Sequence, residues 1–177
     1  MTFNTVRFTT LKIASISLYL GLAPFNLGIA QTEVSASTWF QNNQGKVRLI
    51  SAIRGIGKSK NIQLGLQFKL KDNWKIYWRA PGDAGSPPQL DWKKSSNLKN
   101  IDFFWPTPTR FEVLGLQTIG YKKEVVFPML ATVINPEQPL QLNLALNYLT
   151  CDDICIPIKT NLELTLPPYN SVATQHQ

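Results

Sequence analysis

The chain has 177 residues, of which 44% are hydrophobic and 16% charged, and its formal net charge is +7 at pH 7. This length is enough for one domain with its own core, preceded by an export signal. The lysines and arginines are scattered, many in pairs and none in a long run, which indicates solvated faces and guarded strand edges. We therefore expect no nucleic-acid partner.

Residues 1–30 have the pattern of a secretory signal peptide. Basic residues, and no acids, precede an apolar run over residues 13–23, and Gly28-Ile29-Ala30 supplies small residues before a cleavage point. A retained membrane anchor is the alternative, but the run is short for a span of about 20 residues and Pro24 follows it. We expect export, cleavage, and no stable membrane insertion afterwards.

The rest of the chain divides into a polar leader (31–45), a domain (46–167) and a polar tail (168–177), which we expect to be disordered. Within the domain, alternation with a period of two, or a composition rich in aromatic and β-branched residues, predicts short strands. These strands are expected over residues 46–53, 62–70, 74–78, 89–92, 101–105, 124–134, 140–148 and 162–166. No sustained helical repeat appears, so the fold class is all-β, an antiparallel β-sandwich.

Three stretches are less regular. Glycines and prolines predict a loop over residues 79–88. Residues 110–121 contain apolar residues without a sustained period, and we interpret them as a long loop with exposed apolar side chains and room for one short strand. Pro128 argues for an edge or a bulge in its strand, because proline donates no backbone hydrogen bond.

The two cysteines lie between two runs with strand alternation. Cys151 and Cys155 follow the run over residues 140–148 and precede the run over residues 162–166. Residues four apart in an extended strand have Cα atoms about 13 Å apart, whereas a disulfide needs roughly 4.4–6.8 Å. A bond therefore requires the chain to turn at Asp152-Asp153, a pair that suits a turn. We predict a β-hairpin with both sulfurs near its connection and, in an exported chain, a disulfide.

The residues available for chemistry favour thiol-disulfide exchange. The only histidine is His176 in the tail, so neither a histidine-assisted hydrolase nor a typical structural zinc site is expected. We expect no metal and no cofactor. Asp152 and Asp153 disfavour the thiolate forms of Cys151 and Cys155, so the pair should react mainly with an incoming thiolate. An inert disulfide is the alternative.

Several short motifs follow one another in a set order along the domain. They are the run over residues 73–88 (NWKIYWRAPGDAGSPP), Trp105-Pro106, Ile119-Gly120-Tyr121, Phe127-Pro128, and the stretch from Tyr148 through both cysteines to Pro157. Together they resemble the N-terminal periplasmic domain of the DsbD family of thiol:disulfide interchange proteins, in its ScsB-like branch. The resemblance covers roughly residues 44–167 and implies an immunoglobulin-like sandwich.

The resemblance also implies a function. Cys151 and Cys155 would relay electrons from a thioredoxin-like domain or a membrane electron-transfer protein to oxidised periplasmic proteins, as a reductase-type relay without a bound cofactor. Family members continue into such electron-transfer domains, whereas this sequence ends after the sandwich, so we expect a separate donor. The cysteines are closer in sequence than in the best-known DsbD domains, as in the ScsB-like branch, so the substrate cannot be carried over.

In the family, an aromatic residue on a loop covers the cysteines as a cap. Residues 110–121 are our candidate loop, with Phe111 or Tyr121 as the cap; the alternative is that both are ordinary core aromatics. Two further hypotheses remain for the whole domain. It is a non-enzymatic binding module with an inert disulfide and a protein or copper-linked partner, or it is a residual domain that has lost its function.

Overall fold

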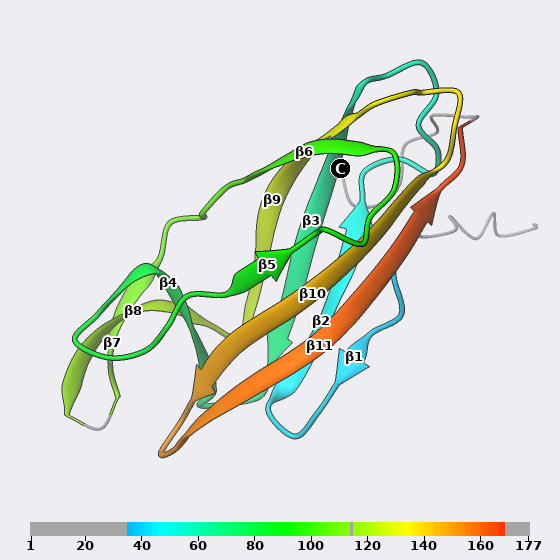
Figure 1. The fold of residues 1–177 in the computed structure, drawn as a ribbon. Coiled ribbons are helices and arrows are strands. Elements are labelled where there is room, and N and C mark those ends of the chain that lie inside the picture. The colour runs from blue at the N-terminus through cyan, green and yellow to red at the C-terminus, as the bar shows by residue number, and fades with distance from the viewer. Residues whose placement is uncertain (1–34, 114, 169–177) are drawn as a thin grey trace, which may run out of the picture. The chain divides into compact units, whose positions relative to one another are not determined.

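The computed structural model describes residues 35–113 and 115–168, and all regular structure in them is β-strand (Figure 1). The predicted signal peptide and the part of the tail beyond residue 168 lie outside the described residues. The all-β, immunoglobulin-like antiparallel sandwich is confirmed. The strands are β1 (Phe40–Gln41), β2 (Gly45–Ser51), β3 (Asn61–Leu70), β4 (Lys75–Gly82), β5 (Gln89–Asp91), β6 (Leu98–Phe103), β7 (Thr109–Val113), β8 (Leu116–Lys122), β9 (Glu124–Val133), β10 (Leu140–Cys151) and β11 (Cys155–Leu166).

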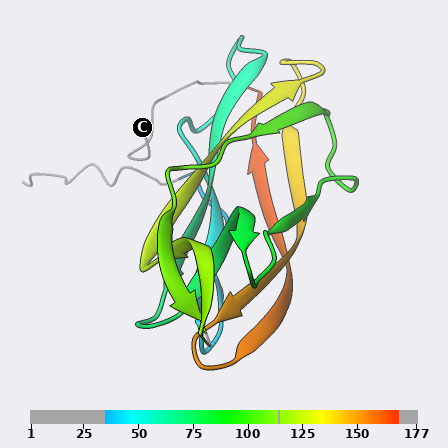
Figure 2. The ribbon, with the colours of Figure 1, turned by 90° about the vertical axis from the view of Figure 1, so that its left-hand side faces the viewer.

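The strands form two sheets. One has the order β1-β2-β3-β9-β6, and the other has the order β11-β10-β4-β8-β7, with β5 paired to β10. Every pairing is antiparallel, as the short turns between many successive strands require. Figures 1 and 2 both show the β10–β11 turn and the β7–β8 hairpin at the same end of the domain.

The main core lies between the sheets and is built around an aromatic cluster. Phe127 on β9 is fully buried, with its ring centroid 5.9 Å from that of Phe68 and 5.0 Å from that of Tyr121. Phe68 in turn lies 5.1 Å from Tyr148 on β10. The Phe127–Tyr121 and Phe68–Tyr148 contacts join the two sheets edge to face, because β3 and β9 belong to one sheet and β8 and β10 to the other.

The prediction of a long loop over residues 110–121 is wrong, because this stretch forms the β7–β8 hairpin. Phe111 pairs with Thr118, and the apolar side chains of Phe111 and Tyr121 are buried rather than exposed. The two glycines that suggested a loop have other roles. Gly115 has φ of 79° in the connection, and a Cβ at Gly120 would collide with the backbone carbonyl of Ile76 on β4.

Two smaller corrections concern β4 and β9. The predicted loop over residues 79–88 begins later, since β4 continues to Gly82 after a register shift. β9 lies inside its sheet and its pairing with β3 runs through Pro128 without a register shift, so the edge or bulge predicted from Pro128 is wrong. The Pro128 carbonyl accepts from the backbone N–H of Phe104, so the proline nitrogen faces the β6 side just beyond Phe103, where β6 ends. The backbone N–H that proline lacks would therefore point past the end of β6, where no strand hydrogen bond is lost.

The predicted polar leader contributes to the sheet within its described part. Ala36 forms a bridge to Ile50, and β1 pairs with β2 through Phe40 and Val47. No helix in the described residues is long and apolar enough to cross a membrane.

Replacing Phe127 with Ala should lower the free energy of unfolding by about 3–5 kcal/mol, because it empties the centre of the aromatic cluster. Urea denaturation followed by tryptophan fluorescence measures this loss. Ile134→Ala is the control, since Ile134 is 62% exposed and should change stability by less than about 0.5 kcal/mol. Equal losses in the two variants would show that the cluster does not hold the sheets together.

Candidate redox site

The β10–β11 hairpin ends in a disulfide. Its strands pair from Leu140 and Leu166 to Cys151 and Cys155, which face each other as the last pair. The two sulfurs are bonded at 2.09 Å, and the Cα atoms are 4.1 Å apart, close to the separation of about 4.5 Å for facing residues outside a hydrogen-bonded pair. The backbone N–H of Asp152 donates to the carbonyl of Ile154 across the connection. The structure thus confirms the hairpin, with its turn between the cysteines.

The two cysteines have different surroundings. Cys155 is exposed, whereas Cys151 is 0% exposed. Cys151 belongs to a small group of buried side chains, here called the outer cluster, which is separate from the main core. Its members are Tyr77 on β4, Phe111 and Val113 on β7, and Cys151. One sulfur is therefore held in a packed environment while its partner reaches solvent.

Tyr77 is the largest side chain of the outer cluster and is fully buried. A Cβ at Gly85 would overlap the Tyr77 ring, so the loop after β4 lies directly against it, with Gly85 at φ of 100°. The Tyr77 hydroxyl has no hydrogen-bond partner among the described residues, and burial raises the pKa of Tyr77. Sequence analysis did not single out this residue, because the WKIYW run has an ordinary strand composition.

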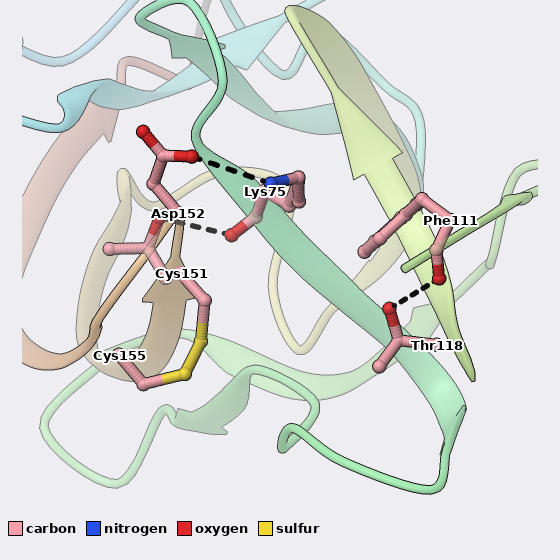
Figure 3. A network of polar contacts seen from close by, with 7 residues as sticks. Lys75, Phe111, Thr118, Cys151, Asp152 and Cys155 are labelled. Atoms are coloured by element: carbon pink, nitrogen blue, oxygen red, sulfur yellow. Dashed lines mark hydrogen bonds and ion pairs between the residues drawn. A yellow bond between two sulfur atoms is a disulfide. The ribbon is translucent and has the colours of Figure 1, made fainter. Parts of the chain in front are cut away.

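An ion pair lies beside the disulfide. Lys75 faces Cys151 across the β4–β10 pairing, and its Nζ lies 3.6 Å from Oδ1 of Asp152 (Figure 3). The Lys75 side chain is only 11% exposed, and its backbone carbonyl accepts a 3.0 Å hydrogen bond from the hydroxyl of Thr150. Asp153, the other acid expected to tune the thiols, is exposed. Sequence reasoning placed two acids beside the sulfurs and missed the cation that pairs with one of them.

The chemistry available at this site is that of the sulfurs. In residues 35–113 and 115–168, no group of three or more His, Cys, Asp or Glu side chains gathers at metal-binding distance. The sulfurs of Cys151 and Cys155 are bonded to each other. A disulfide with one exposed cysteine can react with an incoming thiolate.

Comparison with known proteins adds the family. The model of the family described as "Thiol:disulfide interchange protein DsbD, N-terminal" matches residues 49–167. The chain belongs to this family. The crystal structure of the N-terminal periplasmic domain of ScsB from Proteus mirabilis is similar, with 30% identity and a TM-score of 0.61 over 78% of this chain and 53% of that one. This DsbD N-terminal domain thus spans about half the length of the ScsB structure that it matches.

A second solved structure is less similar. The N-terminal domain of Neisseria meningitidis DsbD in the reduced form matches with 18% identity and a TM-score of 0.38, over 73% of this chain and 90% of that one. No match was found among curated proteins.

The two candidate cap residues of this DsbD N-terminal domain lie in different places. Phe111 is 7% exposed and belongs to the outer cluster with Cys151, its ring centroid 6.3 Å from that of Tyr77. The Lys122 ammonium lies 5.0 Å from the Phe111 ring centroid, and the Thr118 hydroxyl donates to the Phe111 carbonyl at 3.0 Å (Figure 3). The position of Phe111 is compatible with a cap, and that role stays a prediction.

Tyr121 belongs to the main core instead. Its hydroxyl donates to the carbonyl of Pro106 at 2.8 Å, and its ring packs against Phe127. Burial raises the pKa of Tyr121 to about 12. It does not share the outer cluster with Cys151, so of the two candidates Phe111 is the one that we carry forward.

Phe111→Ala should speed the reaction of the reduced cysteines with a small aromatic disulfide several-fold, because it opens the packing over Cys151. Stopped-flow absorbance under native conditions measures the rate. Tyr121→Ala is the matched aromatic deletion in the main core, and we expect it to lower stability with little effect on the rate of the folded fraction. A Phe111→Ala domain that stays folded and reacts at the original rate would exclude the cap.

Proposed function

We propose that this domain is an exported thiol-disulfide interchange module of the periplasm. Cys151 and Cys155 would accept electrons from a thioredoxin-like domain or a membrane electron-transfer protein and pass them to oxidised periplasmic proteins, in the manner of a protein-disulfide reductase. The observation that carries the proposal is the disulfide at the end of the β10–β11 hairpin, with Cys155 exposed and Cys151 buried, in a domain of the DsbD N-terminal family. The similar ScsB domain is periplasmic, in agreement with the signal-like residues 1–30.

The difference in exposure gives the reaction a direction. A donor thiolate attacks Sγ of Cys155, a new disulfide forms between the donor and Cys155, and the Cys151–Cys155 bond breaks. The electron pair of that bond remains on Cys151 as a thiolate, which then takes a proton from solvent. The second thiolate of the donor attacks the donor's own sulfur in the mixed disulfide and releases Cys155. The donor is thereby oxidised to a disulfide, and the domain is reduced to a dithiol.

Reduction of an acceptor reverses these steps and forms the Cys151–Cys155 bond again. A Cys155 thiolate attacks the acceptor disulfide and releases one acceptor thiolate, which takes a proton. Cys151 then attacks Cys155 in the mixed disulfide, restores the Cys151–Cys155 bond, and releases the second acceptor thiolate. Two electrons pass to the acceptor in each cycle.

Single-cysteine variants should test this order of attack. Cys151→Ser, which keeps Cys155, should form a mixed disulfide with glutathione disulfide several times faster than Cys155→Ser, which keeps the buried Cys151. Mass spectrometry of samples quenched with acid follows both reactions. Equal rates, or a faster reaction in Cys155→Ser, would show that exposure in the oxidised form does not select the attacked sulfur.

The reduction potential tests the function itself. A hairpin disulfide with three residues between the cysteines gains little chain entropy, so we expect a potential higher than about −300 mV, above the range of inert structural disulfides. Equilibration with mixtures of reduced and oxidised glutathione, followed by alkylation and mass measurement, gives the value. A pair that stays oxidised at the most reducing ratio would contradict the relay and favour a binding module with an inert disulfide.

A further inference from the structure

Four side chains form a row across the six-stranded sheet next to the disulfide. Cys155 pairs with Cys151, Cys151 pairs with Lys75, and Lys75 pairs with Lys122, so the row crosses β11, β10, β4 and β8. Directly opposite residues of antiparallel strands project from the same face, with Cβ atoms about 4.5–5.5 Å apart. The row lies on the face away from the main core, because the neighbouring residue Ile76 is buried in that core. Two lysines therefore extend the line of the two sulfurs.

This arrangement is unfavourable for the sheet alone. Like charges directly opposite each other on neighbouring strands destabilise the pairing, and the Lys75 side chain is only 11% exposed. Asp152 offsets part of the cost through its 3.6 Å ion pair with Lys75. A polar cleft at the same place is also lined by Glu112 and Lys122, together with Asp72 and Lys123. The Lys75 side chain is thus largely withdrawn from solvent, and Asp152 is its one ion-pair partner among the described residues.

The exchange reaction supplies a reason to keep a cation there. When Cys155 is attacked, the broken bond leaves its electron pair on Cys151, whose residue is fully buried. Burial disfavours a thiolate, whereas a nearby cation favours it. Lys75 is the cationic residue paired directly with Cys151 in the sheet. A more stable leaving thiolate departs faster.

We propose that Lys75 stabilises the Cys151 thiolate formed during exchange, and that Asp152 sets how much of the lysine charge acts on the sulfur. This inference rests on the proposed function, because only an exchange step produces that thiolate. The negative charge develops on Cys151 as the disulfide bond breaks. In the oxidised domain the charge on Lys75 is engaged by Asp152, and in the mixed disulfide it is shared between the carboxylate and the sulfur.

Removing the charge of Lys75 and removing the charge of Asp152 should shift the pKa of the Cys151 thiol in opposite directions. In the Cys155→Ser background, ultraviolet absorbance of the thiolate reports the titration of Cys151 directly. Lys75→Met should raise the pKa of the Cys151 thiol by about one pKa unit, because it leaves Asp152 without its cation. Asp152→Asn should lower that pKa by a similar amount. The double variant should return close to the background value, and Lys75→Arg should preserve it.

A matched pair of charges on the other sheet provides the control. Lys69 lies 3.3 Å from Glu124 on strands of the sheet that does not contain the disulfide, and Lys69→Met should leave the Cys151 titration unchanged. The inference is overturned if Lys75→Met and Asp152→Asn move the titration in the same direction, or if neither moves it. If Lys75→Met does not fold, Lys75→Arg and Asp152→Asn still decide, since the first must preserve the pKa and the second must lower it.

The titration needs no electron donor, so it tests the electrostatic role of Lys75 independently of the proposed exchange function. An inert disulfide in the wild-type domain, with the expected pKa changes in the variants, would reject the proposed function and leave the electrostatic effect standing. An exchange-active disulfide with unchanged titrations would reject the role of Lys75 alone.

Discussion

The site depends on the register of the β10–β11 hairpin. The pairing that places Leu140 against Leu166 also places Cys151 against Cys155 at the other end of the two twelve-residue strands. A slip of one residue between the two strands would turn the buried leucines of one of them toward solvent, so the hydrophobic core fixes the position of the disulfide. The β4–β10 pairing then brings Lys75 alongside Cys151. The geometry of the redox site is therefore set by the same burial that stabilises the sandwich.

A second, smaller core supports the buried sulfur. Tyr77, Phe111 and Val113 enclose Cys151 on the side of the sheet opposite the main core, and they come from strands rather than from free loops. Phe111 is further fixed because its carbonyl accepts a hydrogen bond from Thr118 on the neighbouring strand. Side chains on paired strands hold a reacting group more precisely than side chains on loops do. The domain thus presents a reactive bond on a rigid frame.

The sequence was sufficient to predict the features that depend on local pattern. Strict alternation predicted β3, most of β10 and the second part of β11 (residues 162–166), and the position of the only cysteines between two such runs predicted the hairpin and its disulfide. The β7–β8 hairpin was missed because Gly115 and Gly120 break the alternation, one in a turn and the other at a close approach of two strands. Lys75 and Tyr77 were missed for a different reason. Their relation to Cys151 comes from a pairing between strands far apart in the chain, which no local pattern contains.

The small ring closed by the disulfide makes folding only partly dependent on the redox state of the cysteines. A loop of this size contributes only about 2 kcal/mol by chain-entropy estimates, against a stability of about 5–15 kcal/mol for a typical domain. The strands on both sides of the cysteines are paired along their whole length by hydrogen bonds that do not involve sulfur. The reduced molecule should consequently remain folded, with a melting temperature several degrees below that of the oxidised one. In the proposed relay, the domain would thus remain folded in either redox state and escape removal as a damaged protein.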